Sequence, residues 1–306
     1  LSNLRYQLSG YSTDAKFLSE PIAKNTAPAI AISTKYIQSL AQGDDPVILA
    51  VPSDHIIKDL AKFESSIKSA QHLAEQGAVV VFGVKPTYPE TGFGYIKAQG
   101  NEIVEFVEKP NKQTAEKFIA ENGFWNSGIF MFRASVILEE YEKHAPEIIQ
   151  LLSGFDFEKS TEIPFVDYDK MPNISIDYAL IEKSKNLKFA ELESDWEDMG
   201  SWQSFYDIGE KDDNANVKVG HVLDIDSKNS FMYSSSKLVT TIGLEDTVVV
   251  ETEDAILACK KDRVQEVKQV FETLKQISGV GDKVSNCICL FAYGRTRLAP
   301  IDTWIK

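Results

Sequence analysis

The sequence predicts an α/β fold followed by a smaller all-β unit. Residues 47–51 and 78–82 are continuous apolar runs, as expected of strands buried on both faces of a sheet. Between the two runs, apolar residues recur at helical spacing along one face: Phe63, Ile67, Ala70 and Ala74. A strand, a helix and a second strand joined by short links form a βαβ unit, which implies a parallel sheet covered by helices.

Further elements extend this pattern on both sides. Thr26 predicts the start of a helix that reaches about residue 41, because its hydroxyl can cap the first turn and Pro28 suits that turn. Strands are expected at residues 94–96, 103–107, 129–132 and 187–192. Helices are expected at residues 112–120, 135–141, 146–152 and 176–183.

The character of the chain changes after about residue 214. Short β runs separated by Asp, Ser, Asn and Gly follow at residues 219–223, 231–233, 239–242, 248–251 and 255–258. Such frequent short strands indicate a small β-solenoid-like domain, although no strict repeat is visible. A final helix is expected from Asp262, which forms a capping box with Gln265. Its apolar stripe is expected at Val264, Val267, Phe271 and Leu274.

Composition limits the classes of function. The chain has 306 residues, 43% of them hydrophobic, and 46 acidic against 32 basic residues give a formal charge of −14. Such a surface repels nucleic acid, and a small phosphorylated substrate would need local cations or a metal ion. No apolar run approaches the roughly 20 residues of a membrane span, and no secretion signal is visible. The cysteines Cys259, Cys287 and Cys289 are expected to be free thiols, which predicts a reducing, cytoplasmic location. Assembly into a homo-oligomer is left open.

Two neighbouring segments carry the groups that a sugar phosphate needs. Glu108 and Lys109 end one apolar run, and Asn126 begins another. Lys109 precedes Pro110, so extended geometry is expected there, with the ammonium reaching outward as a point charge for phosphate. Glu108 can accept hydrogen bonds from sugar hydroxyls, and Asn126 can both donate and accept. A plain turn between a strand and a helix is the alternative.

Gly92 and Gly94, next to Tyr95, add to this expected site. Glycines let backbone amides approach a ligand closely, and the aromatic ring stands beside them. Glycines in this number also occur in ordinary strand turns.

Two carboxylates are candidates for holding a metal ion. Asp54 follows the strand at 47–51, at the sheet edge where open parallel sheets bind ligands. Asp198 follows the strand at 187–192. Carboxylates in such places can hold Mg²⁺, which prefers oxygen ligands and engages phosphates. The alternatives are a simple cap at Ser53 or Asp54 and an Asp-x-Gly turn at Asp198.

Taken in order, seven segments resemble mannose-1-phosphate guanylyltransferases, also called GDP-mannose pyrophosphorylases. They are EPIAKNTAPA (20–29), PSDH (52–55), FGYI (93–96), FVEKP (106–110), NSGIF (126–130), SIDYA (175–179) and WEDMG (196–200). TEDA at 252–255 and the last helix also resemble the end of that family's pattern. The resemblance spans about residues 4 to 277.

The resemblance implies a fold, a reaction and a set of site residues. The fold would be a Rossmann-like, mixed but mostly parallel sheet with helices on both faces, followed by a β-solenoid-like domain and a C-terminal helix. The reaction would join GTP and mannose 1-phosphate into GDP-mannose and pyrophosphate with Mg²⁺. Asp54 and Asp198 would bind the metal and Lys109 the sugar phosphate. Substrate contacts would come from Glu108, Asn126, Gly94, Tyr95 and Asp177 at the sugar, and from Asn25, Thr26 and Glu20 near guanine.

The chain departs from that family at its two ends. Members open with a strand and a glycine-rich loop that wraps the triphosphate. Residues 1–214 are expected to form a nucleotidyltransferase domain that lacks this strand and loop at its N-terminus. Residues 215–280 are expected to form the β-solenoid-like domain with its terminal helix, and residues 281–306 a tail. Residues 294–300 of the tail resemble the second half of the loop. An unrelated tail is favoured. The alternative is a rearranged chain in which this strand fills the vacant sheet position, because an unfilled position would leave unpaired edges and exposed apolar surface.

Three functions are therefore in competition. The first is guanylyl transfer to mannose 1-phosphate. The second is the same chemistry with another hexose 1-phosphate. The third is the function of a homologue that binds sugar nucleotides without catalysis. Such a protein could lose the loop and still retain Glu108, Lys109 and Asn126.

Overall fold

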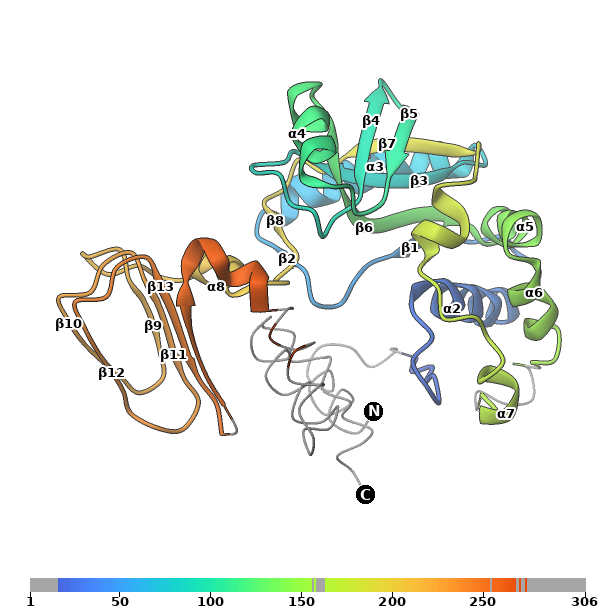
Figure 1. Ribbon diagram of the computed structural model, residues 1–306. Coiled ribbons are helices and arrows are strands. Elements are labelled where there is room, and N and C mark those ends of the chain that lie inside the picture. Colours follow the sequence, from blue (N-terminus) through green and yellow to red (C-terminus); the bar gives the residue numbers. More distant parts are fainter. Residues whose placement is uncertain are drawn as a thin grey trace. The chain divides into compact units, whose positions relative to one another are not determined.

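The computed structural model describes residues 16–155, 157, 163–253, 255–267, 270 and 273 (Figure 1). The chain forms two compact units. Unit 1 takes the described residues up to Pro52 and from Asp59 to Ser194, and unit 2 takes Ser53–Lys58 and the described residues from Asp195 onward. The predicted boundary at residue 214 stays a prediction. Three predicted features lie outside the described residues: Phe271, Leu274 and the tail 281–306, which contains Cys287 and Cys289.

Unit 1 is built on a six-stranded mixed sheet with the order β1-β6-β3-β7-β5-β4. Its strands are β1 (Val47–Ala50), β3 (Val79–Val84), β4 (Tyr95–Gln99), β5 (Glu102–Val107), β6 (Phe124–Arg133) and β7 (Leu187–Glu191). The predicted α/β character is confirmed, but the expected mostly parallel pairing is wrong for the described residues. Only β3 and β7 pair in parallel, whereas β6 lies antiparallel between β1 and β3. The βαβ unit therefore crosses over an intervening strand that the local apolar pattern does not reveal.

Helices cover this sheet and supply most of the core of unit 1. They are α2 (Thr26–Leu40), α3 (Leu60–Glu75), α4 (Lys112–Ala120), α5 (Ala134–His144), α6 (Pro146–Leu152) and α7 (Phe165–Tyr168). All six residues of β3 are buried, and Val79 and Val81 belong to one core with α2 and α5. Helix α3 packs against β1, β3, β6 and β7. Neither face of the central strand β3 is therefore exposed.

The predicted cap of one helix and the predicted type of another need correction. The N-cap of α2 is Asn25, whose Oδ1 accepts from the Thr26 amide at 2.8 Å, while the Thr26 hydroxyl accepts from the Ile176 amide at 2.9 Å. Thr26 caps nothing because its hydroxyl ties the helix to another segment. The helix expected at 176–183 is instead a π-helix, η1 (Asp177–Ile181), closed by the bond from the Glu182 amide to the Asp177 carbonyl at 3.0 Å.

Strand β1 is less buried than its apolar sequence predicts. All four of its residues are half-buried, and the following Val51 is 52% exposed. Within the described part of the chain, β1 pairs only with β6, so it forms one edge of the sheet. The prediction that both of its faces are covered is therefore wrong for the described residues.

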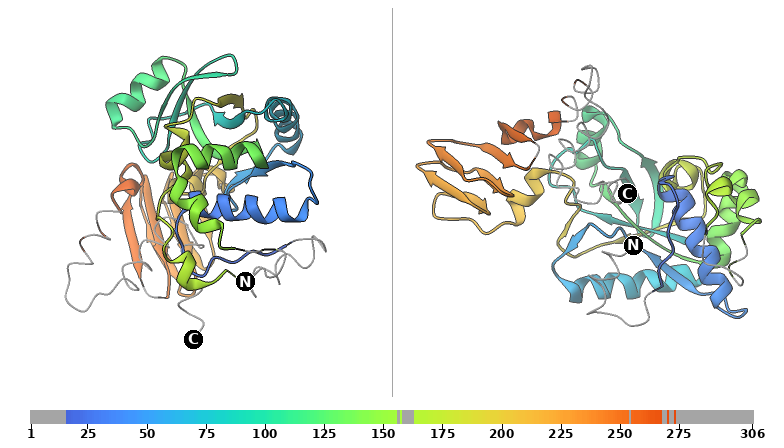
Figure 2. Two further views of the ribbon diagram at one scale, coloured as in Figure 1. Left: turned by 90° about the vertical axis from the view of Figure 1, so that its right-hand side faces the viewer. Right: turned by 90° about the horizontal axis from the view of Figure 1, so that it is seen from below.

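Unit 2 contains a short parallel β-solenoid, which confirms the predicted β-rich second domain. Its strands are β9 (Val217–Val219), β10 (Val222–Ile225), β11 (Phe231–Ser234), β12 (Val239–Ile242), β13 (Thr247–Glu251) and β14 (Ile256–Lys260). Strand β11 pairs in parallel with β9 and β13, and β10 pairs in parallel with β12, so successive coils stack in register (Figure 2). Strand β14 closes the layer antiparallel to β13.

A corner of the solenoid explains one wrong strand prediction. The run at 219–223 is interrupted at Gly220, which has φ +82°. A Cβ there would stand 2.0 Å from the Ser234 carbonyl oxygen of the next coil. Only glycine fits such a close approach with a left-handed backbone, so the chain turns between β9 and β10.

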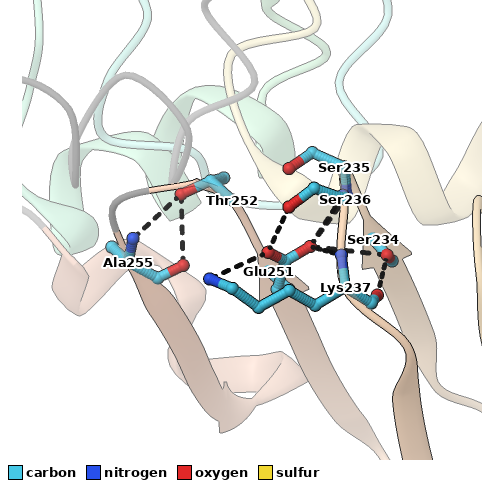
Figure 3. A network of polar contacts seen from close by, with 7 residues as sticks. All are labelled: Ser234, Ser235, Ser236, Lys237, Glu251, Thr252 and Ala255. Carbon is cyan, nitrogen blue, oxygen red and sulfur yellow. Dashed lines mark hydrogen bonds and ion pairs between the residues drawn. The ribbon is translucent and has the colours of Figure 1, made fainter.

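The carboxylate of Glu251 fixes another corner of the solenoid (Figure 3). Its Oε2 accepts from the backbone amides of Ser235, Ser236 and Lys237 at 3.0, 3.0 and 3.1 Å. The Ser236 hydroxyl donates to Oε1 at 3.0 Å, and the Glu251 side chain is only 2% exposed. These bonds hold the pKa of Glu251 down at about 2, with the Ser236 amide as the largest cause.

The core of unit 2 joins the solenoid to two helical segments. Helix α8 (Trp202–Ile208) has Ser201 as its N-cap, and η2 (Lys261–Glu266) is a short 3₁₀ helix. Val264 and Val267 pack with Trp202 and Phe231, as the predicted stripe requires. The predicted cap is displaced, because Lys260 holds the N-cap position of η2 and makes no side-chain bond there, with Asp262 already in the first turn.

Candidate functional site

Four segments of unit 1 meet around Glu108 and Asn126. Glu108 follows β5, Asn126 lies within β6, Gly94 precedes β4, and Asp177 opens η1. The Asn126 amide donates to the Gly94 carbonyl at 2.8 Å, and Asn126 Nδ2 donates to Asp177 Oδ1 at 2.8 Å. A Cβ on Gly94 would stand 2.5 Å from Glu108 Oε2. The predicted sugar-binding groups Gly94, Glu108, Asn126 and Asp177 therefore lie together.

Lys109 adds the only positive charge that touches Glu108 in the described residues. Its Nζ is 3.1 Å from Glu108 Oε1, with the Lys109 side chain 53% exposed and that of Glu108 only 7% exposed. Burial is the main reason that the pKa of Glu108 is raised, followed by the negative charge of Asp177. Burial likewise raises the pKa of Asp177. The site thus sets a half-exposed ammonium over carboxylates whose environment favours the neutral form.

The backbone at Lys109 contradicts the predicted extended geometry. Its φ is +47°, in the left-handed region that a residue with a side chain seldom adopts. The Lys109 amide donates to the Phe93 carbonyl at 3.2 Å, and the Glu108 amide donates to Glu182 Oε1 at 3.2 Å. Tertiary hydrogen bonds therefore outweigh the local preference that Pro110 imposes.

Tyr95 lies buried beneath the site, and its predicted contact with the sugar stays a prediction. The residue is 0% exposed. Its hydroxyl oxygen accepts from Trp125 Nε1 at 2.9 Å, and the rings of Tyr88 and Phe93 pack edge-on against Trp125. The buried ring and its bond to Trp125 therefore give Tyr95 a packing role in the structure described.

The three residues predicted near guanine have different local contacts. Thr26 joins the site through its bond to Ile176, which directly precedes Asp177. Asn25 is exposed and has φ +70°. Glu20 is hydrogen-bonded to the buried Tyr168 hydroxyl, and burial raises the pKa of Glu20. The roles of these three residues toward a base stay predictions.

The two predicted metal ligands lie in unit 2, at one end of a two-stranded antiparallel ribbon. Strand β2 (Ile56–Ile57) pairs with β8 (Trp196–Glu197), so Asp54 precedes one strand and Asp198 follows the other. The Asp198 carboxylate accepts from the Gly200 amide at 2.9 Å, and Met199 has φ +52°. The Asp-x-Gly turn is therefore present, and it fixes the carboxylate rather than excluding it as a ligand.

The donor chemistry of this ribbon fits Mg²⁺. Among the described residues, no group of three or more His, Cys, Asp and Glu side chains could hold a metal ion alone. Mg²⁺ commonly takes only one or two carboxylates from the protein and completes its shell with phosphates and water. Two carboxylates on neighbouring strand ends supply that number.

Two residues of these sites were missed by the sequence analysis. Glu182 touches the Glu108 amide, and its only sequence signal is its place five residues after Asp177. The Nδ1 atom of His55 accepts from Trp196 Nε1 at 3.1 Å across the β2–β8 ribbon. Contacts between distant segments of this kind leave no local pattern in the sequence.

Family models match almost the whole described chain. The model described as nucleotidyl transferase matches residues 4–215. The chain belongs to the nucleotidyl transferase family. The model described as MannoseP isomerase/GMP-like beta-helix domain matches residues 220–274, and this pair of domains confirms the resemblance to mannose-1-phosphate guanylyltransferases.

Curated relatives and solved structures agree with this assignment. Xanthan biosynthesis protein XanB of Xanthomonas campestris pv. campestris is 44% identical over 268 residues, covering 84% of this chain and 57% of the relative. Mannose-1-phosphate guanylyltransferase 2 of Escherichia coli O157:H7 is 42% identical over 275 residues, with the same 84% and 57%. The chain thus spans little more than half the length of these relatives.

One solved structure is similar over most of both chains. The Thermus thermophilus protein titled mannose-1-phosphate geranyltransferase has a TM-score of 0.74 at 28% identity, covering 89% of this chain and 81% of that one. The Helicobacter pylori structure titled mannose-6-phosphate isomerase has a TM-score of 0.55 at 34% identity, covering 63% and 79%. None of the described helices is long and apolar enough to cross a membrane.

Proposed function

We propose that this chain transfers a guanylyl group from GTP to mannose 1-phosphate, giving GDP-mannose and pyrophosphate, with Mg²⁺ as cofactor. The observation that carries the proposal is the convergence of Glu108, Lys109, Asn126 and Asp177 in unit 1. An ammonium suits a phosphate, and carboxylates with a carboxamide suit sugar hydroxyls. The name of the Escherichia coli O157:H7 relative supports the choice of substrates.

The reaction asks the protein mainly for positioning and charge. The phosphate of the sugar is already anionic at neutral pH, so its oxygen can attack the α-phosphorus of GTP without a general base. Lys109 would leave Glu108 to bind the sugar phosphate, and Glu108, Asn126 and Asp177 would fix the sugar hydroxyls. Asp54 and Asp198 would hold Mg²⁺, which when bound supplies charge neutralisation on the phosphates.

The direct test is turnover by this chain. Incubation with GTP, mannose 1-phosphate and Mg²⁺ should release pyrophosphate, and Lys109→Ala should raise the KM for mannose 1-phosphate. Binding of Mn²⁺, followed by electron paramagnetic resonance, should weaken in Asp54→Ala and in Asp198→Ala. Turnover that survives Asp54→Ala unchanged would remove the metal assignment.

The same assay separates the competing functions. Faster turnover with another hexose 1-phosphate would replace mannose 1-phosphate as the acceptor. Calorimetric binding of GDP-mannose without any pyrophosphate release would identify a binding protein in place of an enzyme.

A further inference from the structure

Glu182 and Asp177 are brought to one side by the π-helix η1. The Glu182 amide donates to the Asp177 carbonyl at 3.0 Å, which is the bond between residues five apart that defines a π-turn. In a regular α-helix, residues five apart point about 140° away from each other. The π-turn cancels most of this rotation, so both carboxylates can reach the same site.

Each carboxylate holds a different segment of the candidate site. Asp177 Oδ1 accepts from Asn126 Nδ2 at 2.8 Å, which fixes the carboxamide on β6. Glu182 Oε1 accepts from the Glu108 amide at 3.2 Å, which fixes the turn after β5. Both hydrogen bonds span long stretches of sequence, and both carboxylates are placed by η1.

The turn that Glu182 holds contains the strained residue of the site. Lys109 has φ +47°, a conformation that persists only where the surrounding structure enforces it. The Lys109 amide bonds to the Phe93 carbonyl, and the Glu108 amide bonds to Glu182. Without Glu182 the turn would keep only one of these two backbone anchors.

We infer that Glu182 is a positioning residue for the acceptor site, acting through the Glu108 amide to keep Lys109 in the conformation that meets the sugar phosphate. This inference rests on the proposed function for the identity of the ligand. Glu182 touches no reacting atom in this arrangement. π-Turns inside helices are frequent at functional sites, and here the turn has a definite task, which is to align two carboxylates five residues apart.

Three variants of the full chain test the inference. Glu182→Ala removes the acceptor, Glu182→Gln keeps an acceptor oxygen without the charge, and Glu142→Ala is a matched control at an exposed glutamate of α5. Glu182→Ala should raise the KM and the calorimetric Kd for mannose 1-phosphate about tenfold, because it removes one hydrogen bond to a charged group. The KM for GTP should stay unchanged. Glu182→Gln should recover most of the affinity.

A second measurement does not depend on activity. Hydrogen exchange of the Glu108 amide should accelerate in Glu182→Ala, but not in Glu142→Ala. If that exchange is unchanged, or if Glu182→Ala weakens GTP and mannose 1-phosphate equally, Glu182 does not position the turn. A wild-type chain that neither binds nor turns over mannose 1-phosphate overturns the proposed function, whereas the exchange experiment still decides whether Glu182 holds the turn.

Discussion

Single atoms decide whether the candidate site is intact. Gly94 lies where a side chain would collide with the group expected to grip the sugar, and Tyr95, its neighbour, is wholly buried. Two adjacent residues thus serve opposite needs. Gly94 leaves space for the Glu108 carboxylate, and Tyr95 fills buried space beside Trp125.

Gly94→Ala should weaken the binding of mannose 1-phosphate. The new Cβ would stand 2.5 Å from Glu108 Oε2 and 3.2 Å from Asn126 Cβ, so the flexible Glu108 side chain must move. We expect a calorimetric Kd about tenfold higher, which corresponds to about 1.4 kcal/mol. Gly154→Ala, where the nearest atom is at an ordinary 3.5 Å, is the control and should leave the Kd unchanged. Equal affinities of Gly94→Ala and wild type would contradict the assigned site.

Tyr95→Phe should destabilise unit 1. Removing the hydroxyl takes away the acceptor of Trp125 Nε1 in a buried place. A buried donor without a partner costs about 1–3 kcal/mol, which urea unfolding would detect. Tyr178→Phe changes a ring that is 42% exposed and should have little effect. A loss as large in Tyr178→Phe as in Tyr95→Phe would argue against the burial seen at Tyr95.

At the scale of elements, short segments with tertiary anchors matter more than long regular ones. The π-helix η1 places two site carboxylates, the β2–β8 ribbon carries both candidate metal ligands, and the Ser234–Lys237 corner closes on Glu251. Each is only a few residues long, and each is defined by hydrogen bonds to a distant part of the chain.

The Glu251 corner should make unit 2 sensitive to acid. Its folded-state pKa of about 2 lies below the ordinary value of 4.5, so its contribution is complete above about pH 4.5 and is lost as the pH falls towards 2. Glu251→Gln should therefore lower the melting temperature at pH 7. The difference from wild type should shrink between pH 4.5 and pH 2 in scanning calorimetry. A difference that is constant with pH would show that the charge of Glu251 is not what stabilises the corner.

The sequence predicted those elements whose signals are local. The helices at 112–120 and 146–152 agree with α4 and α6 in both bounds, since Asn111 caps α4 and Pro146 opens α6, so both start signals lie in or next to the segment itself. It also named Glu108, Asn126 and Asp177, which the fold brings together. The insertion of β6 between β1 and β3, the left-handed Lys109 and the contact of Glu182 all depend on distant partners. A local pattern cannot encode them, and a family resemblance supplies only the residues that its motifs contain.

At the scale of the whole molecule, each unit has a core of its own. Ile137 belongs to the core of unit 1, and Phe231 belongs to the core of unit 2. The candidate acceptor site lies in unit 1 and the candidate metal ligands lie in unit 2. Mutations in the two cores should therefore act on different functions first.

Phe231→Ala and Ile137→Ala form a reciprocal test. Phe231 is 1% exposed, and its truncation should cost about 3–5 kcal/mol, while truncation of the fully buried Ile137 should cost about 2–5 kcal/mol. Hydrogen exchange with mass spectrometry should show faster exchange mainly in β9 to β13 for Phe231→Ala and mainly in α5 and β6 for Ile137→Ala. Equal acceleration throughout the chain in both variants would show that the two cores unfold as one.

Strand β1 has a practical consequence for handling the protein. Along one side, its backbone donors and acceptors have no strand partner among the described residues, and its apolar side chains are only half covered. Such an edge can accept any extended peptide as an additional strand, including a strand of another molecule. The light scattered per unit mass of protein should therefore rise with concentration, and purification at low concentration should preserve material that concentration would lose.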